Sequence, residues 1–138
     1  MIKIQKKDFN LENEIAFIKS QHSNIGAVST FVGYVRNIND KKNVTSIDLE
    51  VYPEMAEKKL AEIRGKAIQD FGIIDMIIVH RIGEINIGEN IVLIIAAGEH
   101  RAETFKACEW AIAELKRTTP IWKRETTSKG DVWVSQTP

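Results

Sequence analysis

The sequence predicts an α+β fold in which three helices cover a mixed or largely antiparallel sheet. Two observations support this expectation. Segments with the two-residue alternation of strands and segments with the period of amphipathic helices follow one another in the order β-α-β-β-α-β-β-α-β. Pairs of strands stand between the helices, whereas a doubly wound fold would alternate single strands with single helices. Residues 1–138 are expected to form one domain.

A strand, a helix and a second strand are expected at the start of the chain. Residues 1–9 alternate enough for a short strand, and Asn10 is a suitable N-cap for a helix over 11–21. Residues 26–36 are rich in Val, Thr and aromatic residues, which predicts a strand. Gly33 within this segment indicates a bulge or a close approach by another backbone.

A strand and the second helix follow a polar loop at residues 37–43. Alternation over residues 44–52 predicts a strand that pairs back on 26–36. Pro53 suits the first turn of a helix. The apolar residues that follow it have amphipathic spacing, which predicts a helix ending before Gly72.

Two strongly apolar strands and the third helix form the last part of the pattern. Residues 73–85 and 90–98 predict strands joined by a hairpin-like connection. A third helix is expected from about His100 until just before Pro120, and residues 131–135 predict a final short strand. One side of this helix is expected to carry Phe105, Cys108, Ile112 and Leu115.

Composition and charge narrow the possible functions. Lys and Arg together number 19, as do Asp and Glu, and this balance argues against broad binding to nucleic acids or membranes. The single cysteine allows no internal disulfide, which fits a reducing cytoplasm. We expect no signal peptide and no membrane-spanning segment, because no apolar run is long enough.

The segment "ELKRTTPIWKRE" gathers basic residues around a proline and a tryptophan. Lys116 is expected in the last turn of the third helix, where exposed carbonyl groups favour cations, and this alone would explain it. Lys123 follows Trp122 and the stiffening Pro120, so its position is expected to be fixed by a turn that returns it towards Lys116. Fixed cations beside an aromatic plane suit an anion with a flat ring, such as a phosphorylated heterocycle. Lysines crowded by other cations also lose a proton more easily.

A second candidate anion site is "GEHRAETF", where His100 and Arg101 begin the third helix. Free backbone N–H groups at a helix start favour anions. The alternative interpretation is an ordinary polar helix start capped by Glu99. Arg36, at the end of a predicted strand, is either a phosphate-binding fork or an ordinary charge at the sheet edge.

The histidines and the cysteine predict neither a metal site nor a nucleophile. Three scattered histidines and one cysteine lack the spacing of metal ligands, so no metal or other cofactor is expected. His80 and Arg81 point to opposite faces of a strand, and we interpret His80 as a hydrogen-bonded, partly buried histidine. Cys108 lies on an apolar helix stripe and is assigned to the core.

From the residues alone we therefore expect an anion site, although the reaction does not follow from it. Five basic residues are expected to build this site: Arg36, His100, Arg101, Lys116 and Lys123.

Five segments resemble the large, catalytic subunit family of molybdopterin synthase, in order from Gly26 to Val134. They are "GAVSTFVGYVRN", "LEVYPEMAEKKLAEI", "VHRIGEINIGE", "GEHRAETFKACEWAIAELKRTTPIWKRE" and "GDVWV". The resemblance implies an α/β-hammerhead-type fold. The family commonly reads "LEHYPGM" where this chain has "LEVYPEM", so any role of Val51 and Glu54 is in doubt.

The resemblance implies a sulfurtransferase of molybdenum cofactor biosynthesis. Such a subunit forms a homodimer, and each protomer binds a small ubiquitin-like sulfur-carrier subunit, which gives a heterotetramer. The C-terminal Gly-Gly tail of the small subunit, carried as a thiocarboxylate, supplies sulfur to cyclic pyranopterin monophosphate. Two such transfers give the dithiolene of molybdopterin.

The resemblance also implies roles for individual residues. Lys116 and Lys123 match the catalytic lysines of the family. Its substrate-binding residues match Phe31, Arg36, His100 and Arg101. The pocket of the family is completed across the dimer, which implies that His100 and Arg101 act on substrate held by the other protomer.

Two alternatives remain at this stage. The first is a non-catalytic module that binds a ubiquitin-like Gly-Gly tail, with Lys116 and Lys123 docking its carboxylate. The second is an RNA or nucleotide binder that uses Arg36 and the region of Trp122. The zero net charge disfavours the second alternative.

Overall fold

The computed structural model describes residues 1–39 and 42–134, and within these ranges the chain forms three helices and nine strands. The helices are α1 (Leu11–Gln21), α2 (Pro53–Phe71) and α3 (Arg101–Thr118). The strands are β1 (Ile2–Gln5), β2 (Ala27–Tyr34), β3 (Ile38–Asn39), β4 (Lys42–Val51), β5 (Asp75–Arg81), β6 (Gly83–Asn86), β7 (Asn90–Gly98), β8 (Ile121–Thr127) and β9 (Gly130–Val134). The predicted α+β class with three helices is confirmed.

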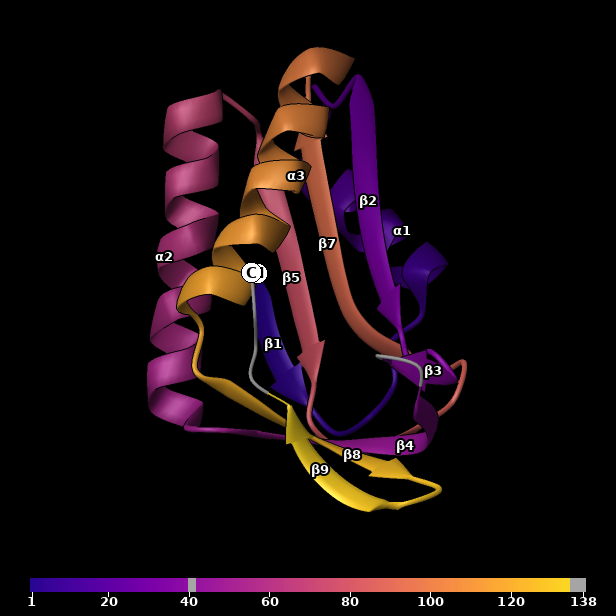
Figure 1. The fold of residues 1–138 in the computed structure, drawn as a ribbon. Helices are drawn as coiled ribbons and strands as arrows, with labels where there is room; N and C mark the ends of the chain where they lie inside the picture. Colours follow the sequence, from indigo (N-terminus) through magenta and orange to yellow (C-terminus); the bar gives the residue numbers. More distant parts are fainter. Residues whose placement is uncertain (40–41, 135–138) are drawn as a thin grey trace.

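The strands form two sheets. The first has the order β1-β5-β7-β2, in which β1 runs parallel to β5 and the other pairs are antiparallel. The second has the order β3-β4-β8-β9, and β6 pairs with β4. Helices α2 and α3 cover one face of the first sheet, α1 covers the other, and β4, β8 and β9 lie across its lower end (Figure 1).

Alternation along the strands of the first sheet sorts their side chains between two apolar clusters. Ile77 and Val79 of β5 face α1, whereas Met76 and Ile78 face α2 and α3. By the same alternation, His80 points to the side of α2 and α3. The larger cluster also includes residues of the second sheet, so both sheets share one core: Ile47, Leu49, Ile85 and Ile121.

Two predictions about the strands are wrong because long-range pairing decides them. Residues 44–52 were expected to pair with 26–36, but β4 pairs with β3, β6 and β8, while β2 pairs with β7. Residues 73–85 were expected to form one strand. The chain instead turns at Gly83, whose φ is +84°, and β5 and β6 enter different sheets.

Other predictions differ in detail. Gly33 lies at a register shift beside Tyr34, so the predicted bulge is present. The atom closest to its open side belongs to the Val92 side chain, and not to another backbone as the alternative prediction had it. Phe105 was expected on the same side of the third helix as Cys108, but it is 64% exposed, whereas Cys108 is buried as predicted. The predicted last strand is present as β9, and its final residue, Ser135, lies outside the described residues.

The segment after Pro120 was expected to be a turn and is instead the strand β8. Pro120 lies in the short connection, and α3 ends with the Thr119 N–H donating to the Leu115 carbonyl at 3.0 Å. Sequence alternation did not reveal β8, because charged residues occupy both of its faces.

Candidate functional site

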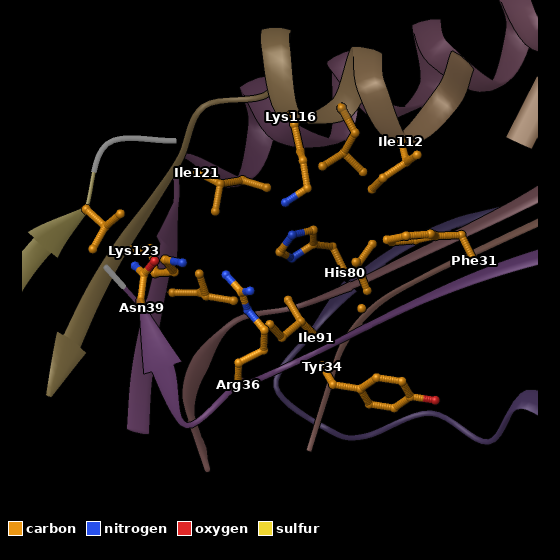
Figure 2. Close-up of a pocket in the computed structure, with 15 residues that line it drawn as sticks. Phe31, Tyr34, Arg36, Asn39, His80, Ile91, Ile112, Lys116, Ile121 and Lys123 are labelled. Carbon is orange, nitrogen blue, oxygen red and sulfur yellow. The ribbon is translucent and has the colours of Figure 1, made fainter. Parts of the chain in front are cut away.

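A cavity of about 510 Å³ lies where the two sheets meet the C-terminal end of α3. One part of its lining is basic and polar, and the rest is apolar (Figure 2). Its polar and aromatic lining residues are Phe31, Tyr34, Arg36, Asn39, His80, Lys116 and Lys123. A cavity of this size is large enough for a small-molecule ligand.

Lys116 enters the cavity from the last turn of α3. Its neighbour Leu115 is buried and fixes this turn of the helix against the core. Partial burial and the charges of Lys123 and Arg36 lower the pKa of the Lys116 ammonium. The interaction with carbonyl groups at the helix end therefore does not fully describe Lys116, because its proton is easier to remove than that of a free lysine.

Lys123 enters the cavity from β8, between two buried residues of the same strand face. Ile121 and Glu125 are 6% and 4% exposed, and strand alternation puts Lys123 on the same side as both. Lys123 stands opposite Leu49 of β4 in the antiparallel register. The pairing of β8 with β4 fixes the position of this lysine more than Pro120 does.

Glu125 is a buried carboxylate that sequence reasoning missed. The side-chain amide of Asn39 donates to both of its oxygens, at 2.9 and 2.8 Å. The Lys123 ammonium lies 3.5 Å from the same carboxylate. Glu125 thus holds Lys123 in place. Alternation places Glu125 on the same face as Ile121 and Lys123 only once β8 is known to be a strand, so the sequence alone carried no signal for it.

Arg36 and Phe31 enter the cavity from β2 and the segment that follows it. The backbone around Arg36 is held by hydrogen bonds from Val35 N–H to the Glu89 carbonyl and from Gly88 N–H to the Val35 carbonyl. Phe31 lies two residues before Gly33 on the strand, so both face the cavity. Figure 2 shows Arg36 pointing into the cavity from the side opposite Lys116.

Within one chain, the cavity brings together three of the five basic residues expected to build the site. Arg36, Lys116 and Lys123 share the cavity, but His100 and Arg101 do not line it. They begin α3, and the 15 residues from Arg101 to Lys116 correspond to about 22 Å along the helix axis. Both side chains are exposed.

The start of α3 is capped by its own third residue. The His100 backbone N–H donates to the Glu103 carboxylate, so Glu103, and not the expected Glu99, provides the cap. The Thr104 hydroxyl donates to the Arg101 carbonyl at 2.8 Å and accepts a 2.8 Å hydrogen bond from Ser29 of β2. These contacts fix the backbone at the start of α3 and therefore the direction in which the His100 and Arg101 side chains project from it.

Trp122 does not provide the aromatic plane that was expected beside the lysines. Trp122 alternates to the outer face of β8 and is 44% exposed. Its ring packs edge-on against Tyr52, with centroids 5.2 Å apart and planes at 84°. The aromatic residues that do line the cavity are Phe31 and Tyr34.

His80 lines the cavity, and sequence reasoning missed it as part of a site. The predicted hydrogen bond is present, from the ring to the Arg81 carbonyl at 2.7 Å, but the side chain is more deeply buried than expected. Burial, and to a lesser extent the Lys116 charge, lowers the pKa of His80 to about 4. Cys108 is buried outside the cavity lining, and burial raises the pKa of its thiol to about 11, which makes it a poor nucleophile.

Within residues 1–39 and 42–134, no cluster of three or more His, Cys, Asp or Glu residues could hold a metal ion. In the same ranges, no helix combines the length and apolar character that crossing a bilayer requires.

The residues of the cavity indicate what it can do chemically. It can hold an anion through Arg36 and two lysines, and it can exchange a proton through Lys116.

Comparison with known proteins gives consistent matches. The model of the family described as "MoaE protein" matches residues 4–118. A molybdopterin synthase catalytic subunit of Pyrococcus abyssi is 42% identical over 128 residues, covering 93% of this chain and 85% of the relative. One from Ralstonia nicotianae is 44% identical over 133 residues, covering 96% and 76%. The crystal structure of molybdopterin synthase from Staphylococcus aureus superposes with a TM-score of 0.88 at 34% identity, covering 95% of this chain and 94% of that chain.

Proposed function

The chain belongs to the MoaE family of molybdopterin synthase catalytic subunits, enzymes of molybdopterin biosynthesis, and on this basis we propose that it transfers sulfur to a pterin precursor. The sulfur donor is the C-terminal Gly-Gly thiocarboxylate of a small ubiquitin-like subunit. The acceptor is cyclic pyranopterin monophosphate. The observation that carries this proposal is that Arg36, Lys116 and Lys123, from three distant segments, converge on one partly apolar cavity.

The positive charge of the cavity suits this reaction because both reactants are anions. At about 4 Å, a phosphate and a thiocarboxylate repel each other by about 1 kcal/mol in water and by several times more in a drier site. Arg36 can bind the phosphate through two parallel N–H groups, while the two lysines offset the charge of the thiocarboxylate. The apolar walls exclude water and strengthen these interactions.

The chemistry needs protons but no oxidant or reductant. The thiocarboxylate sulfur attacks a pterin carbon, a carbon–sulfur bond forms, and a carbon–oxygen bond of the pterin breaks. The departing oxygen takes up a proton. Water then attacks the acyl carbon of the thioester, which releases the tail as a carboxylate and leaves the sulfur on the pterin. That water loses a proton, so one group in the cavity must both give and take protons.

The structure favours Lys116 for the proton transfers and Lys123 for fixed charge. The pKa of Lys116 is lowered, and no ion pair from a described carboxylate reaches its ammonium. Lys123 lies 3.5 Å from the buried Glu125, and this carboxylate keeps the lysine in place. The sulfur nucleophile comes from the partner, so the buried Cys108 has no part in the transfer.

We further propose that the site is completed in a homodimer, within a heterotetramer that includes two small subunits. His100 and Arg101 are too far from Lys116 of the same chain to bind one small substrate together with it. A second copy could bring them to the cavity. Both sheets and α3 contribute to this cavity, which supports treating residues 1–138 as one domain.

The test is reconstitution with a thiocarboxylated small subunit and cyclic pyranopterin monophosphate, followed by an assay for the dithiolene product. We expect product with the wild-type chain, and we expect Lys116→Ala to bind the small subunit with unchanged affinity but form little product. No product from an authentic, fully loaded partner would overturn the enzymatic proposal. Equal loss of binding and product in Lys116→Ala would favour a non-catalytic module that binds the tail.

A further inference from the structure

His80 is the most buried polar group of the cavity, and neither of the two lysine roles uses it. It is 4% exposed and lies at the end of β5. Strand alternation turns its ring toward α3, on the same side as the core residues Met76 and Ile78. Figure 2 shows the ring between Lys116 and Arg36, with the Lys116 ammonium directed toward it.

The backbone sets the tautomer of this histidine. Its Nδ1 lies 2.7 Å from the Arg81 carbonyl oxygen. A carbonyl only accepts hydrogen bonds, so Nδ1 must carry the proton. The pKa of His80 is lowered to about 4, chiefly by burial, so the ring is neutral near pH 7. Nε2 therefore carries a lone pair, and among the hydrogen bonds of the described residues none uses it.

The charged groups that face His80 are mainly cations. Lys116 approaches from α3, Arg36 from the segment after β2, and Lys123 from β8. The nearby carboxylate of Glu125 is bound by Asn39 and Lys123. The Arg81 side chain points away and donates to the Lys6 and Asn90 carbonyls. His80 thus presents a neutral acceptor in a group of donors.

We propose that His80 is a positioning residue for Lys116: its Nε2 accepts a hydrogen bond from the Lys116 ammonium and keeps that group directed into the cavity. The inference rests on the proposed sulfur transfer. A carboxylate in this place would hold the proton on the lysine more firmly. A neutral acceptor orients Lys116 and stabilises its ammonium less than a carboxylate would.

This arrangement also suits the second half of the reaction. After Lys116 has given its proton to the departing oxygen, the neutral amine still has two N–H groups. One of them can donate to Nε2 of His80, which leaves the amine lone pair directed to the cavity. That lone pair can then accept the proton from the attacking water, and the ammonium is restored.

The first test compares His80→Phe, which keeps the ring shape but removes the acceptor, with His80→Gln, which restores an acceptor oxygen. A hydrogen bond to a charged group is worth about 10- to 100-fold in rate, and we expect this loss of single-turnover sulfur transfer in His80→Phe. Small-subunit binding should be unchanged. The limb of the pH–rate profile that depends on Lys116 should move to lower pH, because the ammonium loses its acceptor.

His80→Gln should recover most of the rate lost in His80→Phe, and the matched control His22→Phe, outside the cavity, should leave the rate unchanged. A wild-type rate and an unshifted pH profile in His80→Phe would overturn the proposal. A lower rate with an unshifted profile, and no recovery in His80→Gln, would show a merely structural role and would overturn it as well.

A second measurement does not require a His80 variant to fold. The ¹⁵N resonances of the His80 ring in the wild-type chain should show a protonated Nδ1 and an unprotonated Nε2, and Lys116→Met should shift Nε2 alone. A protonated Nε2, or no shift in Lys116→Met, would contradict the contact. These spectra need neither the small subunit nor the pterin. Failure of the contact is therefore distinguishable from failure of the sulfur transfer itself.

Discussion

The two ends of α3 carry similar cations in opposite surroundings. At the C-terminal end, which we call the enclosed end because the cavity lies there, Lys116 still exposes part of its side chain to solvent. Partial burial and the neighbouring charges of Lys123 and Arg36 lower its pKa. At the N-terminal end, His100 and Arg101 are exposed, and Glu103 caps the backbone there. The enclosed end can bind and react with a small anion by itself. The exposed end is a set of donors that still needs a ligand or a second surface opposite it.

This difference shows why basic residues in one helix should not be combined into one site by residue type alone. The cations at the enclosed end come from three elements that the tertiary fold brings together. The cations at the exposed end are sequence neighbours, and sequence proximity alone places them together. The experiments below test whether the two ends differ in function as they do in structure.

The largest effect is expected from Lys116→Ala. Loss of the proton-exchanging group should lower single-turnover sulfur transfer by about 10³-fold, in the range of general acid–base catalysis. Arg117→Ala is the matched control, because Arg117 is exposed, pairs with Glu114 and should leave the rate unchanged. Similar losses in the two variants would show that the cavity does not distinguish Lys116 from its neighbour.

Mixing two inactive variants tests whether the two ends meet across a dimer. Lys116→Ala and a His100→Ala/Arg101→Ala double variant, unfolded and refolded together, should recover about one quarter of wild-type activity, since half of the dimers are mixed and each has one intact site. Size-exclusion chromatography confirms the dimers. No recovery, with mixed dimers present, would mean that both ends act within one chain.

A smaller loss is expected from Glu125→Gln. The amide keeps the shape of the side chain but removes its negative charge. In the wild-type chain this carboxylate pairs with Lys123 and accepts two hydrogen bonds from Asn39. We expect a loss of about 10-fold in rate and a fall of about 1 to 3 kcal/mol in the free energy of unfolding. Asp131→Asn on β9 serves as the exposed control. Unchanged transfer in Glu125→Gln would exclude a role in holding Lys123.

Acid should destabilise the enclosed end through His80. Its pKa is about 4 in the folded chain, against 6.5 for a histidine free of these surroundings, so the unfolded chain binds the proton first as the pH falls. The stabilisation is complete above pH 6.5 and is lost as the pH falls toward 4, by about 3 kcal/mol in all. Urea unfolding of wild type and His80→Gln at several pH values measures it. Parallel pH dependences for the two proteins would contradict this prediction.

The smallest effect is expected midway along α3, at Cys108. This thiol is buried and its pKa is raised, so Cys108→Ala should change the rate by less than about twofold. The small cavity that the substitution leaves should cost about 1 kcal/mol of stability. Activity and thermal unfolding check both values. A large loss of transfer without loss of stability would give the thiol a role that its position does not explain.

Local pattern was enough to predict the α+β class, the three helices and most of the strands. What it could not predict is which strands pair, because pairing depends on contacts between residues far apart in the chain. The segment of Lys123 was predicted to be a turn, since Pro120 and the charges on both faces of β8 hid its alternation. The break at Gly83, which sends β5 and β6 into different sheets, was missed because residues 73–85 together have the apolar character of one strand.

The same limits apply to the site. Arg36, Lys116 and Lys123 were identified, and the structure brings them to one cavity. His80 and Glu125 were not identified as part of it, because their environment arises only when β5 and β8 come together with α3. Trp122 was expected beside the lysines but lies on the outer face of β8, and its place could be seen only after β8 was known to be a strand.

The unbroken course of α3 has a consequence for how its length can vary. Each added residue turns one end of an α-helix by about 100° relative to the other. A single insertion between Arg101 and Lys116 would therefore direct Lys116 out of the cavity or His100 and Arg101 away from their present heading. Insertions of about seven residues would restore the angle but lengthen the helix by about 10 Å. Loops elsewhere in the chain have no such restriction on length. In α3, by contrast, the number of residues sets both the distance and the angle between the two groups of cations.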